Sequence, residues 1–378
     1  NYDPSYINRN SLTFSINNLN SKKTKKLFKY YENLYQEIAY KISEDHKKYW
    51  KPEDSNSRID LPKIKVISKK KDDFFPGRKI EDVEKNFSNW PRSHGGFSSM
   101  RFSSLDLINK NNVGKLKLAW QFNSNDGKKG IQANPVVYEG MVYLPTPGNN
   151  IVCLDGTNGK VIWRYETKKG YNAAKRGLLI WKDEKNNTLR LYFTNDDQLI
   201  SLNAKTGKPI KNFGHNGIVK IGSSPIPPAI IDNKLIIGTF RPSIEAYDIE
   251  NGKLYWKYYL REISEENFGE RDFKGGFPWG GLSADTKNGI VYLSTGNPKP
   301  NFVGTLRPGK NLFANSVIAF DVRNKKKLWH FQETCHDIWN HDIPSPPILT
   351  TINKYGKRID VVVGVTKLGN TLVLDRYT

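Results

Sequence analysis

The sequence predicts an all-β fold of the β-propeller type, built from four-stranded antiparallel blades. Three observations support this class: short β-rich runs broken by Gly, Asn and Pro fill the chain from about Trp90 onward, the runs repeat, and each repeat carries the same turn. The copies lie about 45 to 75 residues apart, as expected for blades with variable loops. The repeat is found at residues 151–163, 199–210, 244–256, 317–329 and 370–378.

Each copy has a strand that ends in Asp or Asn, a tight turn that usually carries Gly, and then a Lys and a second strand, which often ends in Trp. The Asp or Asn side chain is expected to accept hydrogen bonds from turn N–H groups, and Gly to adopt a positive φ. Trp is expected to pack one blade against its neighbour, so these residues are predicted to be structural. The turn anchors are Asp155, Asn203, Asp248, Asp321 and Asp375.

Residues 1–88 differ from the propeller region at residues 89–378 and are predicted to form an N-terminal extension. They are polar and rich in Lys, and apolar side chains recur at helical spacing in residues 24–49. We expect this helix to dock onto a neighbouring surface; a helix that lies on a membrane surface is the alternative.

Composition limits the partners and metals that the chain is expected to bind. The net charge of +21 comes from lysines scattered along the chain rather than gathered in one stripe, which argues against a nucleic-acid partner. The absence of a run of about 18 apolar residues predicts a soluble globular protein. Cys153 and Cys335 have no CxxC or CxxCH spacing, which indicates neither a structural zinc site nor covalently attached haem.

The last repeat stops in mid-turn at Thr378, and a closed ring of blades cannot leave a sheet edge open in this way. We therefore expect a missing segment or a second chain to complete the ring. Three non-repeating insertions, at residues 168–181, 271–311 and 333–347, interrupt the blades. Functional groups of propellers gather in loops at one mouth of the channel, so these insertions are the predicted place of a site.

The motifs of this region resemble those of the quinoprotein dehydrogenases that use pyrroloquinoline quinone (PQQ). The resemblance begins with WPRSHGGFSSMRFSSLDLINKNNVGKLKLAW (residues 90–120) and continues, in the family's order, through RG, PWGGLSAD, STGNP, RPGKN, HDIWNHDIPSPP and TKLGNTLVLDR. Membrane-type glucose dehydrogenases are the most similar subgroup, because the HDIWNHDIP motif continues into prolines. The resemblance implies an eight-bladed propeller, of which this chain covers only the N-terminal blades.

The resemblance also implies how the cofactor is held. Trp279 is expected to stack on the flat quinone, and Arg176 to pair with a cofactor carboxylate, for which a guanidinium fork is suited. Ser224 is a further expected cofactor contact. Lys367 is expected to donate to the quinone oxygens and to stabilise the negative charge that develops on reduction.

The implied metal is a Ca2+ ion bound by Asn297 and Asn340, close to the quinone carbonyl that it polarises. Two positions depart from the family pattern. Asn340 stands where the family has an aspartate that acts as the base, and an amide cannot accept the hydroxyl proton at useful pH. Thr239 or Arg241 stands where alcohol-oxidising members place a Glu, so the metal would meet less negative charge than usual.

The candidate catalytic residues are Asn340, Asp342, His341 and Lys367. Asp342 or His341 is expected to supply the base if the loop is re-aimed, because either can accept a proton. The alternative is a chain that has kept the cofactor pocket and lost the oxidation. His336 and Asp337 are predicted to be hydrogen-bonded staples of the loop.

The predicted function is oxidation of a sugar or alcohol hydroxyl by hydride transfer to PQQ. Because no haem motif is present, electrons are expected to pass to an external quinone or cytochrome c, and the family implies a periplasmic setting. The rival is a non-enzymatic PQQ-like propeller that serves as a protein-binding scaffold. Such a scaffold shares the blade repeat but should lack the three insertions, which favours the enzyme; an inactive descendant of the enzyme is the intermediate case.

Overall fold

The computed structural model describes residues 89–377, except for single positions and one stretch, together with Lys29 and Asn33. The exceptions are Ser104, Lys128, Lys129, Lys168, Lys169, Tyr171 and residues 261–273. The chain divides into two compact units, Asn1–Gly77 and Arg78–Thr378. The helix predicted for residues 24–49 and the extension predicted for residues 1–88 lie outside the described residues, apart from Lys29 and Asn33, which are helical. Within the described part of the chain, no helix has the length and apolar character needed to cross a membrane.

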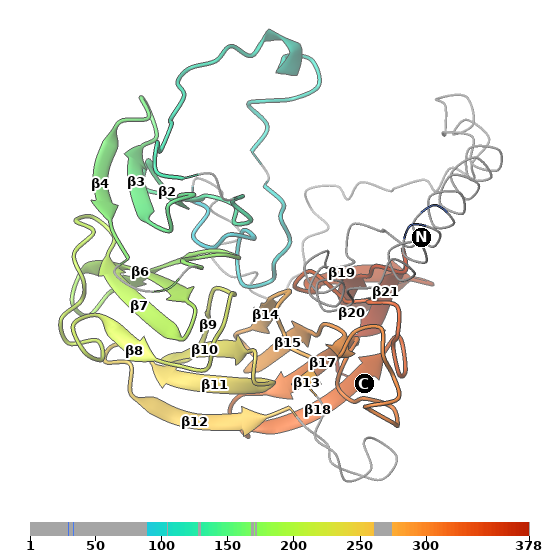
Figure 1. Ribbon diagram of the computed structural model, residues 1–378. Coiled ribbons are helices and arrows are strands. Elements are labelled where there is room, and N and C mark those ends of the chain that lie inside the picture. The colour runs from blue at the N-terminus through green and yellow to red at the C-terminus, as the bar shows by residue number, and fades with distance from the viewer. Residues whose placement is uncertain are drawn as a thin grey trace. The chain divides into compact units, whose positions relative to one another are not determined.

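The second unit consists of antiparallel sheets that follow one another along the chain, each an up-and-down meander (Figure 1). Blade 1 contains β1 (Val136–Tyr138), β2 (Met141–Pro145), β3 (Ile151–Asp155) and β4 (Val161–Tyr165). Blade 2 contains β5 (Leu179–Asp183), β6 (Thr188–Asn195), β7 (Gln198–Asn203) and β8 (Ile218–Lys220). Blade 3 contains β9 (Ala229–Ile231), β10 (Lys234–Thr239), β11 (Ser243–Asp248) and β12 (Leu254–Tyr259).

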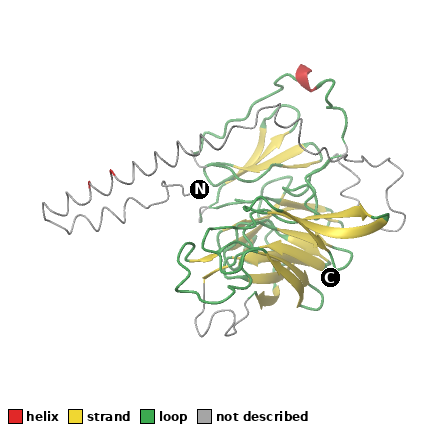
Figure 2. Ribbon diagram, turned by 90° about the vertical axis from the view of Figure 1, so that its right-hand side faces the viewer, coloured by secondary structure: helices red, strands yellow, loops and turns green. Residues whose placement is uncertain are grey.

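Blade 4 contains β14 (Leu282–Asp285), β15 (Ile290–Ser294), β17 (Ser316–Asp321) and β18 (Lys326–Gln332). Blade 5 has three described strands, β19 (Ile348–Lys354), β20 (Lys357–Val365) and β21 (Thr371–Asp375). A two-stranded ribbon pairs β13 (Lys274–Gly275) with β16 (Pro298–Lys299), and a short 3-10 helix spans Val113–Lys115. Strands and loops thus make up nearly all of the described chain (Figure 2), which confirms the predicted all-β class and its four-stranded antiparallel blades.

The repeated turns have the structure that the sequence predicted. Every anchor is the last residue of the third strand of its blade, at the ends of β3, β7, β11, β17 and β21. Its side-chain oxygen accepts hydrogen bonds from N–H groups two or three residues later, for example Oδ1 of Asp155 from Thr157 at 2.7 Å and Oδ1 of Asp321 from Asn324 at 2.9 Å. These bonds satisfy backbone N–H groups of the tight turn.

Blade 2 departs from the repeat. The sequence predicts its fourth strand directly after the turn, but Pro209 forms only an isolated bridge with Leu202, and the outer strand β8 begins at Ile218. Proline has no N–H group to donate to the ladder, so continuous pairing cannot start there. This is also the copy without a terminal Trp.

The tryptophans link consecutive blades, as predicted. Nε1 of Trp163 in blade 1 donates to the backbone oxygen of Ala204 in blade 2 at 2.8 Å, and its ring covers Gly207. Gly207 has a φ of +70°, and a Cβ there would lie 2.6 Å from the indole, so both conformation and space require glycine. Trp329 of blade 4 donates to the backbone oxygen of Arg376 at 3.2 Å. Four apolar clusters fill the interfaces between blades 1 and 2, 2 and 3, 3 and 4, and 4 and 5.

Residues 90–99, called the central strap below, cross the first strands of successive blades. Trp90 bridges Val137 in β1, and the N–H group of Ile180 in β5 donates to Pro91 at 2.7 Å. Further along the strap, the N–H groups of Ala284 in β14 and Leu349 in β19 donate to Phe97 at 2.8 Å and Ser98 at 2.9 Å. The sequence grouped this stretch with an opening blade, whereas the structure shows that it ties the blades to one another.

The buried side chain of Arg92 strengthens the strap. Its guanidinium donates to the backbone oxygens of Pro228, at the start of blade 3, and Leu282, in blade 4, at 3.1 and 2.9 Å. Charge-assisted hydrogen bonds of this kind are the form in which a buried arginine is tolerated.

Candidate active site

Asp337 holds the loop at residues 336–347 in shape, and its side chain is fully buried. The carboxylate accepts hydrogen bonds from the backbone N–H groups of Trp339 and His341, both at 2.8 Å, and from Nδ2 of Asn315 at 3.1 Å. Because these bonds serve the loop itself, Asp337 is the staple that the sequence predicted.

The preceding insertion is fastened to this loop by the buried side chain of Arg307. Its guanidinium donates to the backbone oxygen of Asn301 at 3.0 Å and to that of Asp337. Nδ1 of His336 lies 2.9 Å from the backbone oxygen of Gly309, a second link between the same two segments. His336 is therefore also a staple, as predicted, and the two insertions are held as one unit.

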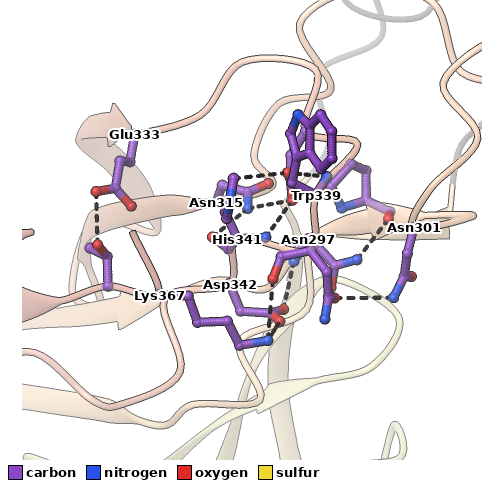
Figure 3. Close-up of polar contacts among 12 residues, drawn as sticks. Asn297, Asn301, Asn315, Glu333, Trp339, His341, Asp342 and Lys367 are labelled. Atoms are coloured by element: carbon purple, nitrogen blue, oxygen red, sulfur yellow. Dashed lines mark hydrogen bonds and ion pairs between the residues drawn. The ribbon is translucent and has the colours of Figure 1, made fainter. Parts of the chain in front are cut away.

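Asp342 is the carboxylate at the centre of the site, and only 3% of its surface is exposed. Its Oδ1 accepts a hydrogen bond from the backbone N–H of Asn297 at 2.8 Å and another from Nε1 of Trp279 at 3.2 Å. Its Oδ2 pairs with the ammonium group of Lys367 (Figure 3). Four predicted site residues, which come from three separate segments of the chain, therefore meet at one carboxylate.

Arg176 approaches the same centre from the insertion between blades 1 and 2. Its guanidinium carbon lies 4.5 Å from the ring centroid of Trp279, within the range of a cation–π contact. Both side chains are half-buried, and burial lowers the pKa of Arg176, although a guanidinium remains charged in proteins. The site thus combines an aromatic face with a fixed positive charge.

The central strap and the following residue Arg101 add polar and charged groups that the sequence did not reveal. Burial, together with the positive charges of Arg92, Arg101 and Arg176, lowers the pKa of His94 to about 3. Nδ1 of this neutral ring is buried without a hydrogen-bond partner in the described part of the chain. The sequence shows that Arg92, His94 and Arg101 are close to one another along the chain. Only folding brings them near Arg176. The result is a polar cluster suited to an anionic group.

The side chains of three predicted residues have partners other than the central carboxylate, although the backbone oxygen of Asn340 accepts a hydrogen bond from Lys367 at 3.2 Å. Oδ1 of Asn340 accepts a hydrogen bond from Nδ2 of Asn301 at 3.1 Å, and Nδ1 of His341 faces Asp337 at 3.4 Å (Figure 3). Ser224 is 1% exposed, and its hydroxyl donates to the backbone oxygen of Gly238 at 2.7 Å. Because its single proton is used within the fold, Ser224 has no further hydrogen to donate, and the cofactor contact predicted for it stays a prediction.

The residues present do not suit the Ca2+ ion expected between Asn297 and Asn340. Calcium takes six to eight oxygen ligands, several of them usually carboxylates, whereas no group of three or more His, Cys, Asp or Glu side chains placed to hold a metal is found in the described residues. Both oxygens of Asp342 already accept hydrogen bonds from protein donors. The hydroxyl of Thr239, at 2.6 Å from the backbone oxygen of Arg241, is buried and engaged.

Residues 90–378 match the family described as glucose/ethanol/alcohol dehydrogenase, β-propeller domain, of the PQQ type. The chain belongs to this PQQ dehydrogenase family. It is 30% identical over 332 residues to the quinohemoprotein alcohol dehydrogenase ADH IIB of Pseudomonas putida, a match that covers 79% of the chain and 47% of the relative. It is also 30% identical over 347 residues to the quinoprotein glucose dehydrogenase A of Acinetobacter calcoaceticus, covering 76% of the chain and 43% of the relative.

Solved structures of PQQ dehydrogenases share this fold. The quinohemoprotein alcohol dehydrogenase ADHIIG from Pseudomonas putida HK5 superposes with a TM-score of 0.68 at 25% identity, covering 80% of the chain and 48% of that structure. The quinohemoprotein alcohol dehydrogenase of Comamonas testosteroni gives a TM-score of 0.66 at 27% identity, covering 79% and 50%. The chain spans about half the length of these relatives. Because alcohol and glucose dehydrogenases match equally well, the family is established and the predicted glucose subgroup stays a prediction.

The site of this PQQ dehydrogenase chain has a donor set suited to the organic cofactor. PQQ is a flat quinone that carries carboxylates, and a bound carboxylate is best met by arginine or lysine. Arg176 and Lys367 are such groups, and the unpartnered Nδ1 of His94 lies near Arg176. The half-buried indole of Trp279 supplies an aromatic surface beside them.

Proposed function

We propose that this chain carries the catalytic site of a PQQ-dependent dehydrogenase that oxidises a sugar or alcohol hydroxyl, with Asp342 as the base. One observation carries the proposal: the buried carboxylate of Asp342 is bracketed by the indole of Trp279 and the ammonium group of Lys367. A proton acceptor, an aromatic platform and a positive charge are thus held at one point. Bound PQQ supplies the acceptor for the hydride that leaves the substrate carbon.

Asp342 has the chemistry that Asn340 lacks. A carboxylate can take the proton of the substrate hydroxyl, whereas the amide of Asn340 has no such basicity. The bonds to Asn297 and Trp279 fix the position of Oδ1, and Oδ2 keeps a free lone pair beside Lys367. The position two residues further along the chain therefore takes over the base function.

Lys367, Trp279 and Arg176 prepare the site for the cofactor and for charge transfer. The side chain of Lys367 is 37% exposed and its ammonium group pairs with Asp342, where it can also donate to an oxygen that gains negative charge. The Arg176 guanidinium rests on the Trp279 ring and can turn toward a carboxylate. A substrate hydroxyl that reaches Oδ2 of Asp342 is thereby flanked by a cation.

The remaining parts of the proposal follow the family. Electrons leave to an external quinone or cytochrome c, and the protein works in the periplasm. The glucose type of substrate is favoured by the HDIWNHDIP motif, and the insertions at residues 168–181, 271–311 and 333–347 favour an enzyme over a scaffold.

The test is a calorimetric titration of the full-length protein with PQQ, followed in the same sample by dye reduction with a panel of sugars and alcohols. Tight binding and turnover are expected, with turnover lost in Asp342→Asn and kept in the matched surface control Glu184→Gln, whose side chain is 77% exposed. Absence of PQQ binding would contradict the proposal.

An inactive descendant is the second candidate, and Asn340 is the observation that favours it. In that case Arg176, Lys367 and Trp279 still bind PQQ, but no substrate reduces the dye. The same two-step experiment separates it from the enzyme, because binding and turnover are read one after the other.

A further inference from the structure

The acidic group at the centre of the site is neutralised by the protein itself. Oδ2 of Asp342 pairs with the ammonium group of Lys367, and Oδ1 is saturated by the donors of Trp279 and Asn297. A divalent cation at Oδ2 would lie beside the ammonium group of Lys367, whose positive charge repels it. The other ligands on offer are neutral amides, and Oδ1 of Asn340 is already bonded to Asn301.

Lys299 is a second lysine close to the segment that binds this carboxylate. It lies in β16, two residues after Asn297 along an extended stretch, and the N–H of Asn297 is the group that binds Asp342. The side chain is half-buried, and burial lowers the pKa of its ammonium group, while the charge of Asp342 raises this pKa and that of Lys367 lowers it. Within the described part of the chain, its ammonium group has no hydrogen bond or ion pair. A half-buried, unpaired cation is costly unless a ligand completes it.

We propose that this site works without a divalent cation and that the ammonium group of Lys299 takes the cation's place, facing Asp342 and the quinone oxygens of bound PQQ. The inference rests on the proposed function, since it concerns the same pocket. Two ammonium groups around one carboxylate leave the site with an excess of positive charge, which repels Ca2+ and attracts an anionic cofactor. An ammonium group can also stabilise a developing oxyanion, the task for which a metal is otherwise used.

The first part of the test measures Ca2+ binding alone, by calorimetry on the chelator-treated full-length protein. No heat of binding attributable to the site is expected, because Ca2+ affinity depends on the number of charged ligands. Saturable binding of Ca2+ that disappears in Asp342→Asn would overturn the inference, whatever PQQ does.

The second part measures PQQ affinity in EDTA and in excess Ca2+. The two dissociation constants are expected to agree within about twofold, and Lys299→Met is expected to weaken PQQ binding by about tenfold or more, which corresponds to the loss of one charge-assisted contact. Lys299→Arg should restore most of the affinity, because the positive charge returns. Lys205→Met, which removes an exposed lysine from a turn of blade 2, is the matched control and should bind as the unmodified protein does.

The outcomes separate the two proposals. PQQ binding that requires Ca2+, or that is indifferent to Lys299→Met in a variant with an unchanged melting temperature, contradicts the role of Lys299 and leaves the dehydrogenase proposal standing. Absence of PQQ binding under both conditions removes the proposed function, and with it this inference. Metal-independent binding that is weakened by Lys299→Met and restored by Lys299→Arg supports both.

Discussion

The blade turns and the loop at residues 336–347 use the same residue, aspartate, in two ways. In the turns, Asp155 and Asp321 accept hydrogen bonds from backbone N–H groups two or three residues away. In the loop, Asp337 repeats this local use and adds one donor from Asn315, whereas Asp342 binds an indole and an ammonium group that lie 63 and 25 residues away. A carboxylate whose partners are local shapes the chain, whereas one whose partners are distant side chains is available for chemistry.

The largest expected effect is that of Asp342→Asn, which tests the catalytic half of this comparison. Turnover should fall by about a thousandfold, the range found when a general base is removed. PQQ affinity and the melting temperature should change little, because the amide can still accept from Asn297 and Trp279. Steady-state dye reduction, calorimetry and thermal unfolding measure the three quantities. A variant that keeps most of its turnover would show that another group is the base.

Trp163→Ala tests the structural half of the comparison. Removal of this indole opens a cavity between blades 1 and 2 and deletes the bond to Ala204, so the free energy of unfolding should fall by about 3 kcal/mol or more. The activity of the protein that remains folded should be unchanged. Urea denaturation measures the first quantity, and a selective loss of turnover without loss of stability would contradict the assignment.

Asp337→Asn tests whether Asp337 has a structural role, as the aspartates of the blade turns do. The new amide would turn a donor toward one of the N–H groups of Trp339 and His341, so a loss of about 1–3 kcal/mol in the free energy of unfolding is expected. Turnover should fall far less than in Asp342→Asn. Equal losses of turnover in the two variants would erase the distinction between them.

A smaller effect is expected from pH, through His94 in the central strap. Its folded-state pKa of about 3 lies below the ordinary value of 6.5, so the unfolded chain binds the extra proton first. The contribution of neutral His94 to the free energy of unfolding is complete above pH 6.5 and is lost as the pH falls from 6.5 toward 3. The free energies of unfolding at pH 7 and pH 5 should differ by about 1–2 kcal/mol more in the unmodified protein than in His94→Gln, as measured by urea denaturation. Equal differences between pH 7 and pH 5 in the unmodified protein and in His94→Gln would mean that His94 becomes charged in the folded protein.

Local chemistry explains why much of the fold could be predicted from the sequence. The anchors and the tryptophans act within one turn or on the next blade, so a repeated pattern is enough to find them. Blade 2 was predicted incorrectly because Pro209 ends the pairing, and the outer strand forms only at Ile218. The central strap could not be predicted, because Arg92 binds backbone oxygens 136 and 190 residues away.

The site was predicted in part. The insertions that carry Arg176, Trp279 and Asp342 were recognised because they break the repeat, and the structure brings these residues together. Burial, which a sequence does not show, affects two further residues: the hydroxyl of Ser224 donates within the fold, and the unpartnered Nδ1 of His94 joins the candidate site. The choice between Asp342 and His341 depends on the direction of each side chain, which only the folded loop fixes.

The most direct test of the central claim is a single-turnover experiment on the PQQ-loaded protein, with reduction of the bound quinone followed by its absorbance after substrate is added. The account predicts that Asn340→Ala reduces the quinone at nearly the unmodified rate, because among the described residues the side chain of Asn340 is bonded to Asn301 rather than to Asp342. Asp342→Asn should show almost no reduction. Loss of reduction in Asn340→Ala together with its persistence in Asp342→Asn would contradict the assignment of the base.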